Sequence, residues 1–528
     1  MSKLNPSTKG NSVDTTVRLA GGTGAYAAKQ SNMEMLRRLV LANLLWEDIA
    51  YADGTSVSDQ IAELIPQCDA VEVAKLAVEC REKQKLRHTP LFIAAEMTKY
   101  ATHKVYVKDI LPRIITRADM LCDFLAIYWK DKKHPLANCV KRGLAESFHN
   151  FDEYQFAKYD RDAVIKLRDV LRMVHPTPKN EDEAALFKRI KERTLKTPDT
   201  WEVAISAVSA DKKADEWTRL IKEKRLGGLA FLRNMANFVN NKVKRSVVEE
   251  GLKNLKGSML LPLDYIKAAK MASGYTREIE DAMISSYKHL PKLPGKTLFI
   301  LDKSGSMNSP ISSKSQFTRL DVACAMAMLA SNVCEDFSLV VTAGDDYAHK
   351  HASVAVDCPP RGFAMNDVVA KCDVSYGGIF TRQVLEWSRH HFQDDEFDRI
   401  IVFSDSQDCD YPGKRTPKPF GKFNYICDVS AEKHGVNFRG VWTAEISGWS
   451  EHFLTYIAAF EKKTMSVLRE IRKVVKDKYA DFKPADSWEE FDKRMAHIKE
   501  CTTEQMAYVK NNLIDYILDP TPDPTAEA

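Results

Sequence analysis

The chain has 528 residues and carries 77 Lys and Arg against 73 Asp and Glu, a formal net charge of +4. This length is enough for two or more domains, each with its own hydrophobic core. No uncharged stretch is long enough to cross a bilayer, and residues 1–20 read as a flexible arm without the apolar segment of a signal peptide. The 11 cysteines form no C-x-x-C pair, which predicts a reducing compartment with neither disulfides nor structural zinc. We therefore expect a cytoplasmic protein that makes no membrane contact.

Charge is unevenly distributed along the chain. Residues 1–290 contain 48 Lys and Arg against 38 Asp and Glu, whereas the remainder contains 29 against 35. A positive amino-terminal part favours an anionic partner such as nucleic acid, although solvated helix faces produce similar sums.

Residues 21–290 are predicted to form a helical domain. Apolar residues recur at helical spacing in five clear segments, 33–46, 71–83, 89–102, 108–129 and 163–174. Short connections with Pro or Gly join segments of similar size. This pattern predicts an α-solenoid, in which each helical pair buries its apolar face on its neighbours.

Two parts of this helical domain carry candidate RNA-binding residues. The first part contains Lys158 and Tyr159, followed by Lys166, Arg168, Arg172 and His175. Cations projecting from one helix suit phosphate contacts, and the competing interpretation is an exposed basic helix face. The second part begins at the pair Gly227-Gly228 and contains Arg233 and Asn234. We interpret Asn234 as structural.

Residues 291–460 are predicted to form an α/β domain. Apolar strands are expected at 297–301, 337–342, 398–403 and 436–444, and helices at 320–334 and 381–392. Continuous apolar strands that alternate with helices are typical of a mostly parallel sheet covered on both faces.

Oxygen-bearing side chains follow the first of these strands. Asp302, Ser304 and Ser306 stand at alternate positions, and Asp405 follows a later strand. Ligands of such sheets bind at the carboxyl ends of the strands. Carboxylates and hydroxyls are ligands for a hard cation such as Mg²⁺, so the pattern predicts a shared cation site.

This half of the chain resembles the von Willebrand factor A fold and its metal-ion-dependent adhesion site. The resemblance implies that Asp302, Ser304 and Ser306 form the first ligand group and that Asp405 is a later carboxylate. The family has a threonine after a glycine pair in a middle loop. Here Ile379 stands at that place, and Thr381, two residues on, is the expected substitute.

The whole order of segments resembles the Ro autoantigen family, also called Rsr in bacteria, with its TROVE domain. The matching landmarks are residues 32–38, Pro90 to Ala95, Lys158-Tyr159, 171–176, Leu229 to Asn234 and Leu261 to Ala269, followed by the A-like domain. The resemblance spans roughly residues 15–450.

That resemblance implies a ring of HEAT-like repeats closed with help from the A-like domain. It also implies binding of small structured Y RNAs on the outer basic surface, with Lys158 and His175 as contacts. Single-stranded 3′ ends of misfolded RNA would enter the central hole, in non-coding RNA quality control or processing. A ribonuclease or another protein is a further expected partner of the A-like domain.

Two other functions compete with a non-enzymatic RNA-binding ring. The first is a metal-dependent protein-interaction scaffold, in which the cation captures a partner's carboxylate. The second is a metal-dependent hydrolase using Asp302 and Asp405, which lacks an evident general base. Residues 461–528 are expected to form a helical extension (462–479, 488–501 and 503–518) with a disordered end.

Overall fold

The computed structural model describes most of the chain up to residue 465. The described residues are 13–18, 26–28, 32–42, 57–130, 132–160, 164–255, 260–311, 317–374, 377–405, 408–410, 419–429, 442–447, 451, 453–462 and 464–465. The predicted helices of the extension beyond residue 465, and its predicted disordered end, lie outside them.

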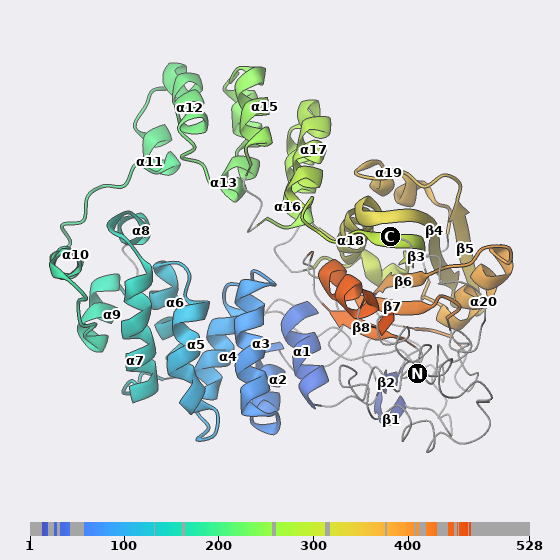
Figure 1. Cartoon of the computed structure of the whole chain (residues 1–528), viewed down its shortest axis with the longest axis horizontal. Helices are drawn as coiled ribbons and strands as arrows, with labels where there is room; N and C mark the ends of the chain where they lie inside the picture. The colour runs from blue at the N-terminus through green and yellow to red at the C-terminus, as the bar shows by residue number, and fades with distance from the viewer. Residues whose placement is uncertain are drawn as a thin grey trace, which may run out of the picture.

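A first arc of helices occupies the amino-terminal part (Figure 1). It contains α1 (Asn32–Ala42), α2 (Val57–Leu64), α3 (Ala70–Glu82), α4 (Thr89–Met97), α5 (Val107–Ile114), α6 (Asp119–Tyr128), α7 (Asn138–Ser147), α8 (Glu153–Tyr159), α9 (Leu167–Val174) and α10 (Glu181–Glu192). Their apolar faces share one core that extends from Leu36 to Ile190. A short antiparallel pair, β1 (Val13–Arg18) and β2 (Tyr26–Ala28), precedes them.

A second arc follows residues 193–200 and leads to the sheet. It contains α11 (Trp201–Ser206), α12 (Lys213–Lys222), α13 (Gly228–Arg233), α14 (Met235–Asn240), α15 (Arg245–Lys253), α16 (Pro262–Met271) and α17 (Thr276–Ser286). Its buried residues belong to a core that begins at Ala204 and continues into one face of the sheet as far as Ile457. The second arc and the A-like domain are therefore one packed body, distinct from the core of the first arc.

The A-like domain contains a six-stranded sheet with helices around it. Its elements are β3 (Leu293–Asp302), α18 (Arg319–Val333), β4 (Cys334–Asp345), β5 (Lys350–Val356), α19 (Ala364–Lys371), α20 (Thr381–His391), β6 (Arg399–Ser404), β7 (Phe423–Asp428) and β8 (Ala444–Ser447). The strand order is β5-β4-β3-β6-β7-β8, and only the pairing of β5 with β4 is antiparallel. Helix-covered parallel strands confirm the predicted α/β class.

The structure differs from the predicted elements in one helix and in two strands that were missed. The single helix expected over 108–129 is two helices, α5 and α6. The break was not evident because Ile115 and Ala118 within it are buried, so the apolar spacing continues across it. Strands β5 and β7 were not predicted. Of the strand expected at 436–444, residues 436–441 lie outside the described residues, and Ala444 begins β8.

A buried ion pair attaches the helix of residues 453–462 to the sheet. Arg399 of β6 donates from Nε and Nη2 to the carboxylate of Glu461, at 2.9 and 2.8 Å. Its Nη1 donates to the hydroxyl of Thr297 on β3, at 2.9 Å. Tyr425 of β7 donates to the same carboxylate, so three neighbouring strands hold this helix at the edge opposite the strands' carboxyl ends.

The first arc returns to the A-like domain, so the chain follows a ring-shaped path in which α1 lies beside β8 (Figure 1). Lys85, just after α3, supplies a polar contact at this closure. Its Nζ donates to the carbonyl of Leu260 at 2.9 Å and to Oε1 of Glu451 at 2.8 Å. Both charged side chains are buried, with 5 and 7% exposure. One ammonium group thus joins the first arc to the second arc and to the A-like domain.

We expect Lys85→Met to weaken this closure strongly. The change leaves the Glu451 carboxylate buried without its cation, which costs about 3–5 kcal/mol in comparable pairs. The denaturant midpoint should fall, and small-angle scattering should report a larger radius of gyration. Lys83→Met, which alters an exposed lysine two residues away, should change neither. Wild-type values for Lys85→Met would mean that the ring closes without this contact.

Candidate functional site

The predicted RNA-binding residues of the first arc lie in the last turn of α8 and along α9. We call Lys158, Tyr159, Lys166, Arg168, Arg172 and His175 the α8–α9 cluster. Helix α8 begins with a capping box, in which Asp152 accepts from the backbone of Gln155 at 2.7 Å. This fixed start places Lys158 and Tyr159 in the last turn of α8, where a cation also complements the helix dipole.

Two cations lie over the ring of Tyr159. The guanidinium carbon of Arg117 is 4.7 Å from the ring centroid, and Nζ of Lys158 is 5.6 Å from it. Cations at such distances are attracted by the negative face of the ring. Arg117 also pairs with Asp119 at 2.7 Å, which fixes the guanidinium in place. Arg117 was not predicted as a site residue, because it stands 41 positions before Lys158 in the sequence.

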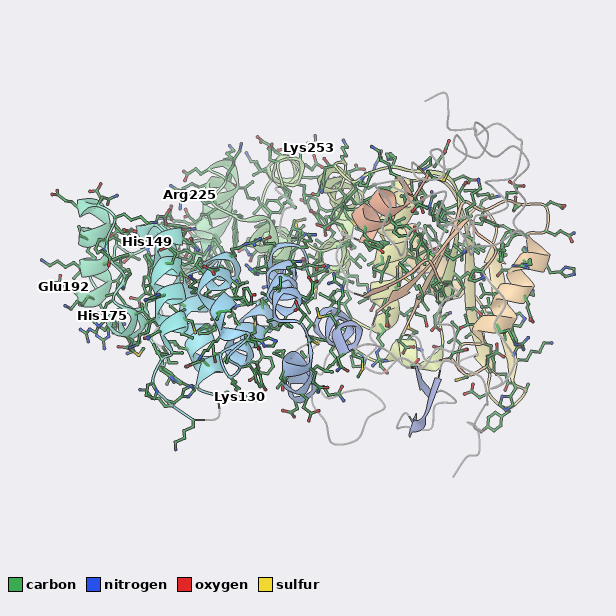
Figure 2. All side chains as sticks on the ribbon, turned by 60° about the horizontal axis from the view of Figure 1, so that its bottom comes forward. Lys130, His149, His175, Glu192, Arg225 and Lys253 are labelled. Carbon is green, nitrogen blue, oxygen red and sulfur yellow. The ribbon has the colours of Figure 1, made fainter. Side chains whose placement is uncertain are left out.

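Helix α9 presents its remaining cations on one face. Leu167, Val170, Leu171 and Val174 are buried against the first-arc core. Arg168 and Arg172, four positions apart, share a different face of the helix, and His175 stands at its C-cap. Arg172 and His175 are exposed, and His175 ends the helix in the left-handed conformation, with φ of 48°. Figure 2 places His175 near Glu192, at the end of the molecule remote from the sheet.

A carboxylate lies among these cations. Burial raises the pKa of Asp160, while the charges of Arg193, Arg168 and Lys166 act in the opposite direction. Asp160, Arg193 and Lys196 line a surface cavity of about 440 Å³ with neighbouring residues of the linker to the second arc. Arg193 and Lys196 were missed by sequence reasoning, because only the fold brings the end of α10 beside α8.

Arg233 lies elsewhere, in the last turn of α13 in the second arc, and is exposed. Its positive charge acts on Asp264, whose carboxylate accepts from the backbone of Leu261 at the start of α16. Asn234 is buried and donates to the carbonyl of Ala230 at 2.8 Å. The structural interpretation of Asn234 is therefore confirmed, and the described contacts do not join Arg233 to the α8–α9 cluster.

The predicted ligands of the A-like domain meet at the carboxyl ends of β3 and β6. Asp302 is fully buried, and it accepts from the backbone of Ser304 at 2.8 Å and from the hydroxyl of Ser404 at 2.6 Å. The hydroxyls of Ser304 and Ser306 lie 3.2 Å apart. Burial first, and then the charge of Asp405, raise the pKa of Asp302 to about 7. We call Asp302, Ser304, Ser306, Ser404 and Asp405 the sheet rim.

Thr381 makes its described contacts outside this group. Its backbone donates to Asp408 at 3.1 Å, and its hydroxyl also hydrogen-bonds that carboxylate. Ile379, at the family's threonine position, is buried, and its backbone forms an isolated parallel β-bridge with that of Asp408. The position that carries a hydroxyl ligand in the resembled family therefore carries an apolar side chain.

The start of α18 brings a cation to the sheet rim. Nη1 of Arg319 donates to Oδ2 of Asp405 at 2.8 Å, with 9 and 0% exposure of the two side chains. Two unit charges 4 Å apart interact by about 4 kcal/mol at an effective dielectric constant of about 20. A divalent cation at the same distance from the guanidinium of Arg319 would be repelled by about twice that energy. The charge of Arg319, as placed, therefore opposes a divalent cation at the rim.

The raised pKa of Asp302 predicts a pH-dependent stability. In the unfolded chain this carboxyl has an ordinary pKa of about 3.9, so between that value and about 7 the folded state binds the extra proton. Stability therefore falls as pH rises through this window and levels off above it. Asp302→Asn should come closest to the wild-type urea midpoint at about pH 4 and exceed it by a margin that grows up to about pH 7. The exposed Asp357→Asn is the control, and a difference between Asp302→Asn and wild type that does not vary with pH would contradict the assignment.

The amino-terminal part of the chain matches a known protein family. Residues 19–196 match the family model of the TROVE domain, a region that includes the whole α8–α9 cluster. This part of the chain is therefore similar to the TROVE domain, as its motifs predict. A sequence comparison with curated proteins finds no match.

The overall fold is similar to that of the solved Ro (Rsr) protein of Deinococcus radiodurans. The similarity covers 80% of this chain and 97% of that chain, with 17% sequence identity and a TM-score of 0.51. It confirms the predicted architecture of a helical ring with an A-like domain. None of the described helices is both long and apolar enough to span a membrane.

Proposed function

We propose that this chain is a Ro-like RNA-binding ring protein that acts by binding rather than by catalysis. The observation that carries the proposal is the α8–α9 cluster, which lies within the region matching the TROVE domain. Its exposed Arg172 and His175 and the half-buried Lys158 and Arg168 offer donors to phosphate oxygens, contacts that bind RNA without reading its sequence.

The proposed ligand of the cluster is a small structured RNA of the Y RNA type. The cations are distributed from the last turn of α8 to the end of α9, and such a spread suits several phosphates of a duplex backbone. The Tyr159 ring, with Arg117 and Lys158 over it, adds an aromatic group near the phosphates. We further propose that single-stranded 3′ ends of misfolded RNA enter the ring, because threading selects by shape. A role in the quality control or processing of non-coding RNA and a cytoplasmic location complete the proposal.

The first test is a charge reversal in the cluster. Lys158→Glu with His175→Ala should weaken binding of a labelled stem–loop RNA by about tenfold or more and reduce the salt slope of log K by about one to two. Fluorescence anisotropy at several KCl concentrations measures both quantities.

The matched control is Lys253→Glu. It makes the same change in net charge at an exposed residue of the second arc, away from His175 (Figure 2). It should retain wild-type affinity. Equal binding by the double variant and by wild type would place the RNA elsewhere, and absence of binding by wild type would overturn the proposed function.

A second test uses Asp160. Asp160→Asn removes a negative charge that now offsets Lys166, Arg168 and Arg193. Affinity for the same RNA should rise by about threefold, since partly exposed charge pairs contribute up to about 1 kcal/mol. Because its pKa is raised, mild acidification should bring wild type closer to the variant.

Asp211→Asn is the control for this test, because it removes the same charge at an exposed position of the second arc. An affinity of Asp160→Asn at or below that of wild type would show that no phosphate approaches Asp160.

A further inference from the structure

We propose that the guanidinium of Arg319 supplies the positive charge of the sheet rim, in the role that a divalent cation holds in adhesion-type A domains. The A-like domain of this chain would then be complete without metal. The inference concerns the A-like domain alone and does not rest on RNA binding.

Hydrogen bonds at the start of α18 fix the backbone position of Arg319. Thr318 caps α18, with its backbone donating to Asp321 at 2.9 Å and its hydroxyl accepting from the backbone of Asp321 at 3.1 Å. The backbone of Arg319 donates to the carbonyl of Ser309 at 3.0 Å. That carbonyl belongs to the loop that continues from Ser306. The backbone at Arg319 is therefore tied to the same loop that carries the rim hydroxyls.

The guanidinium reaches the carboxylate at the end of β6. Its 2.8 Å bond to Asp405 joins residues 86 positions apart, and both side chains are buried. Charge-assisted bonds of this kind are among the stronger contacts in proteins. Since Asp405 sits beside Asp302, whose pKa it raises, Arg319 offsets negative charge at the point where two carboxylates meet.

Asp302, Ser304 and Ser306 are also engaged in hydrogen bonds within the protein. Asp302 uses Oδ1 for the backbone of Ser304 and Oδ2 for the hydroxyl of Ser404. The threonine expected in the middle loop is replaced by Ile379, and the hydroxyl of Thr381 turns to Asp408. A cation would thus have to displace a buried arginine and break these bonds.

The consequence concerns how the A-like domain could recognise a protein. Adhesion-type capture needs an open metal coordination position for a partner's carboxylate. With a guanidinium at the rim, such capture is not available. A partner of this domain would be bound by its surface side chains instead, with no requirement for Mg²⁺.

The first experiment measures metal binding by the full-length wild type. Mn²⁺ titration followed by electron paramagnetic resonance should detect no bound ion, and the melting temperature should be the same in EDTA and in millimolar MgCl₂. A bound Mn²⁺, or a melting temperature raised by Mg²⁺ and lowered by EDTA, would overturn the inference. This measurement decides the question even if a variant fails to fold.

The second experiment compares Arg319→Gln with Arg389→Gln, which removes an exposed arginine of α20. In EDTA the Arg319 variant should melt at a lower temperature than the Arg389 variant, because Asp405 loses its buried partner. It should also acquire Mn²⁺ binding and regain part of its melting temperature in MgCl₂. Equal melting of the two variants, or an Arg319 variant that binds no Mn²⁺, would contradict an exchange of guanidinium for metal.

Discussion

A buried ammonium group, that of Lys85, lies at the closure of the ring. Lys85 contacts Leu260 and Glu451 and so joins the first arc to the body that the second arc forms with the A-like domain. A charge can be buried at such a place only when its partners are correctly positioned, because desolvation costs several kcal/mol per ion. The contact therefore specifies where the first arc returns, as well as adding to the attraction between the parts.

The rest of the architecture follows from how the cores are divided. The first arc packs within itself, whereas the second arc shares its core with one face of the sheet. On the first arc this arrangement leaves the α8–α9 cluster at the end remote from the sheet. At the sheet, two buried arginines act at opposite edges. Arg399 holds the helix of residues 453–462 under the strands, and Arg319 neutralises Asp405 at the rim.

Local pattern was sufficient for most of the fold. The helical character of both arcs, several helices of the first arc and strands β3, β4 and β6 were predictable because the apolar spacing of a helix or a buried strand is a property of neighbouring residues. Prediction failed where structure depends on distant partners. The α5–α6 break is hidden by two buried residues, and β5, whose side chains are mostly half-buried, is a strand because it pairs with β4.

For the functional site, the sequence by itself determined the chemical groups: Lys158, Tyr159 and His175 in the helical ring, and Asp302, Ser304 and Asp405 at the ends of strands. Only the tertiary structure decided what those groups meet. Arg117 and Arg193 come to the α8–α9 cluster, and Arg319 to Asp405, from distant positions in the chain. The physical reason is that Coulomb and hydrogen-bond energies depend on separation in space, which packing fixes and sequence order does not.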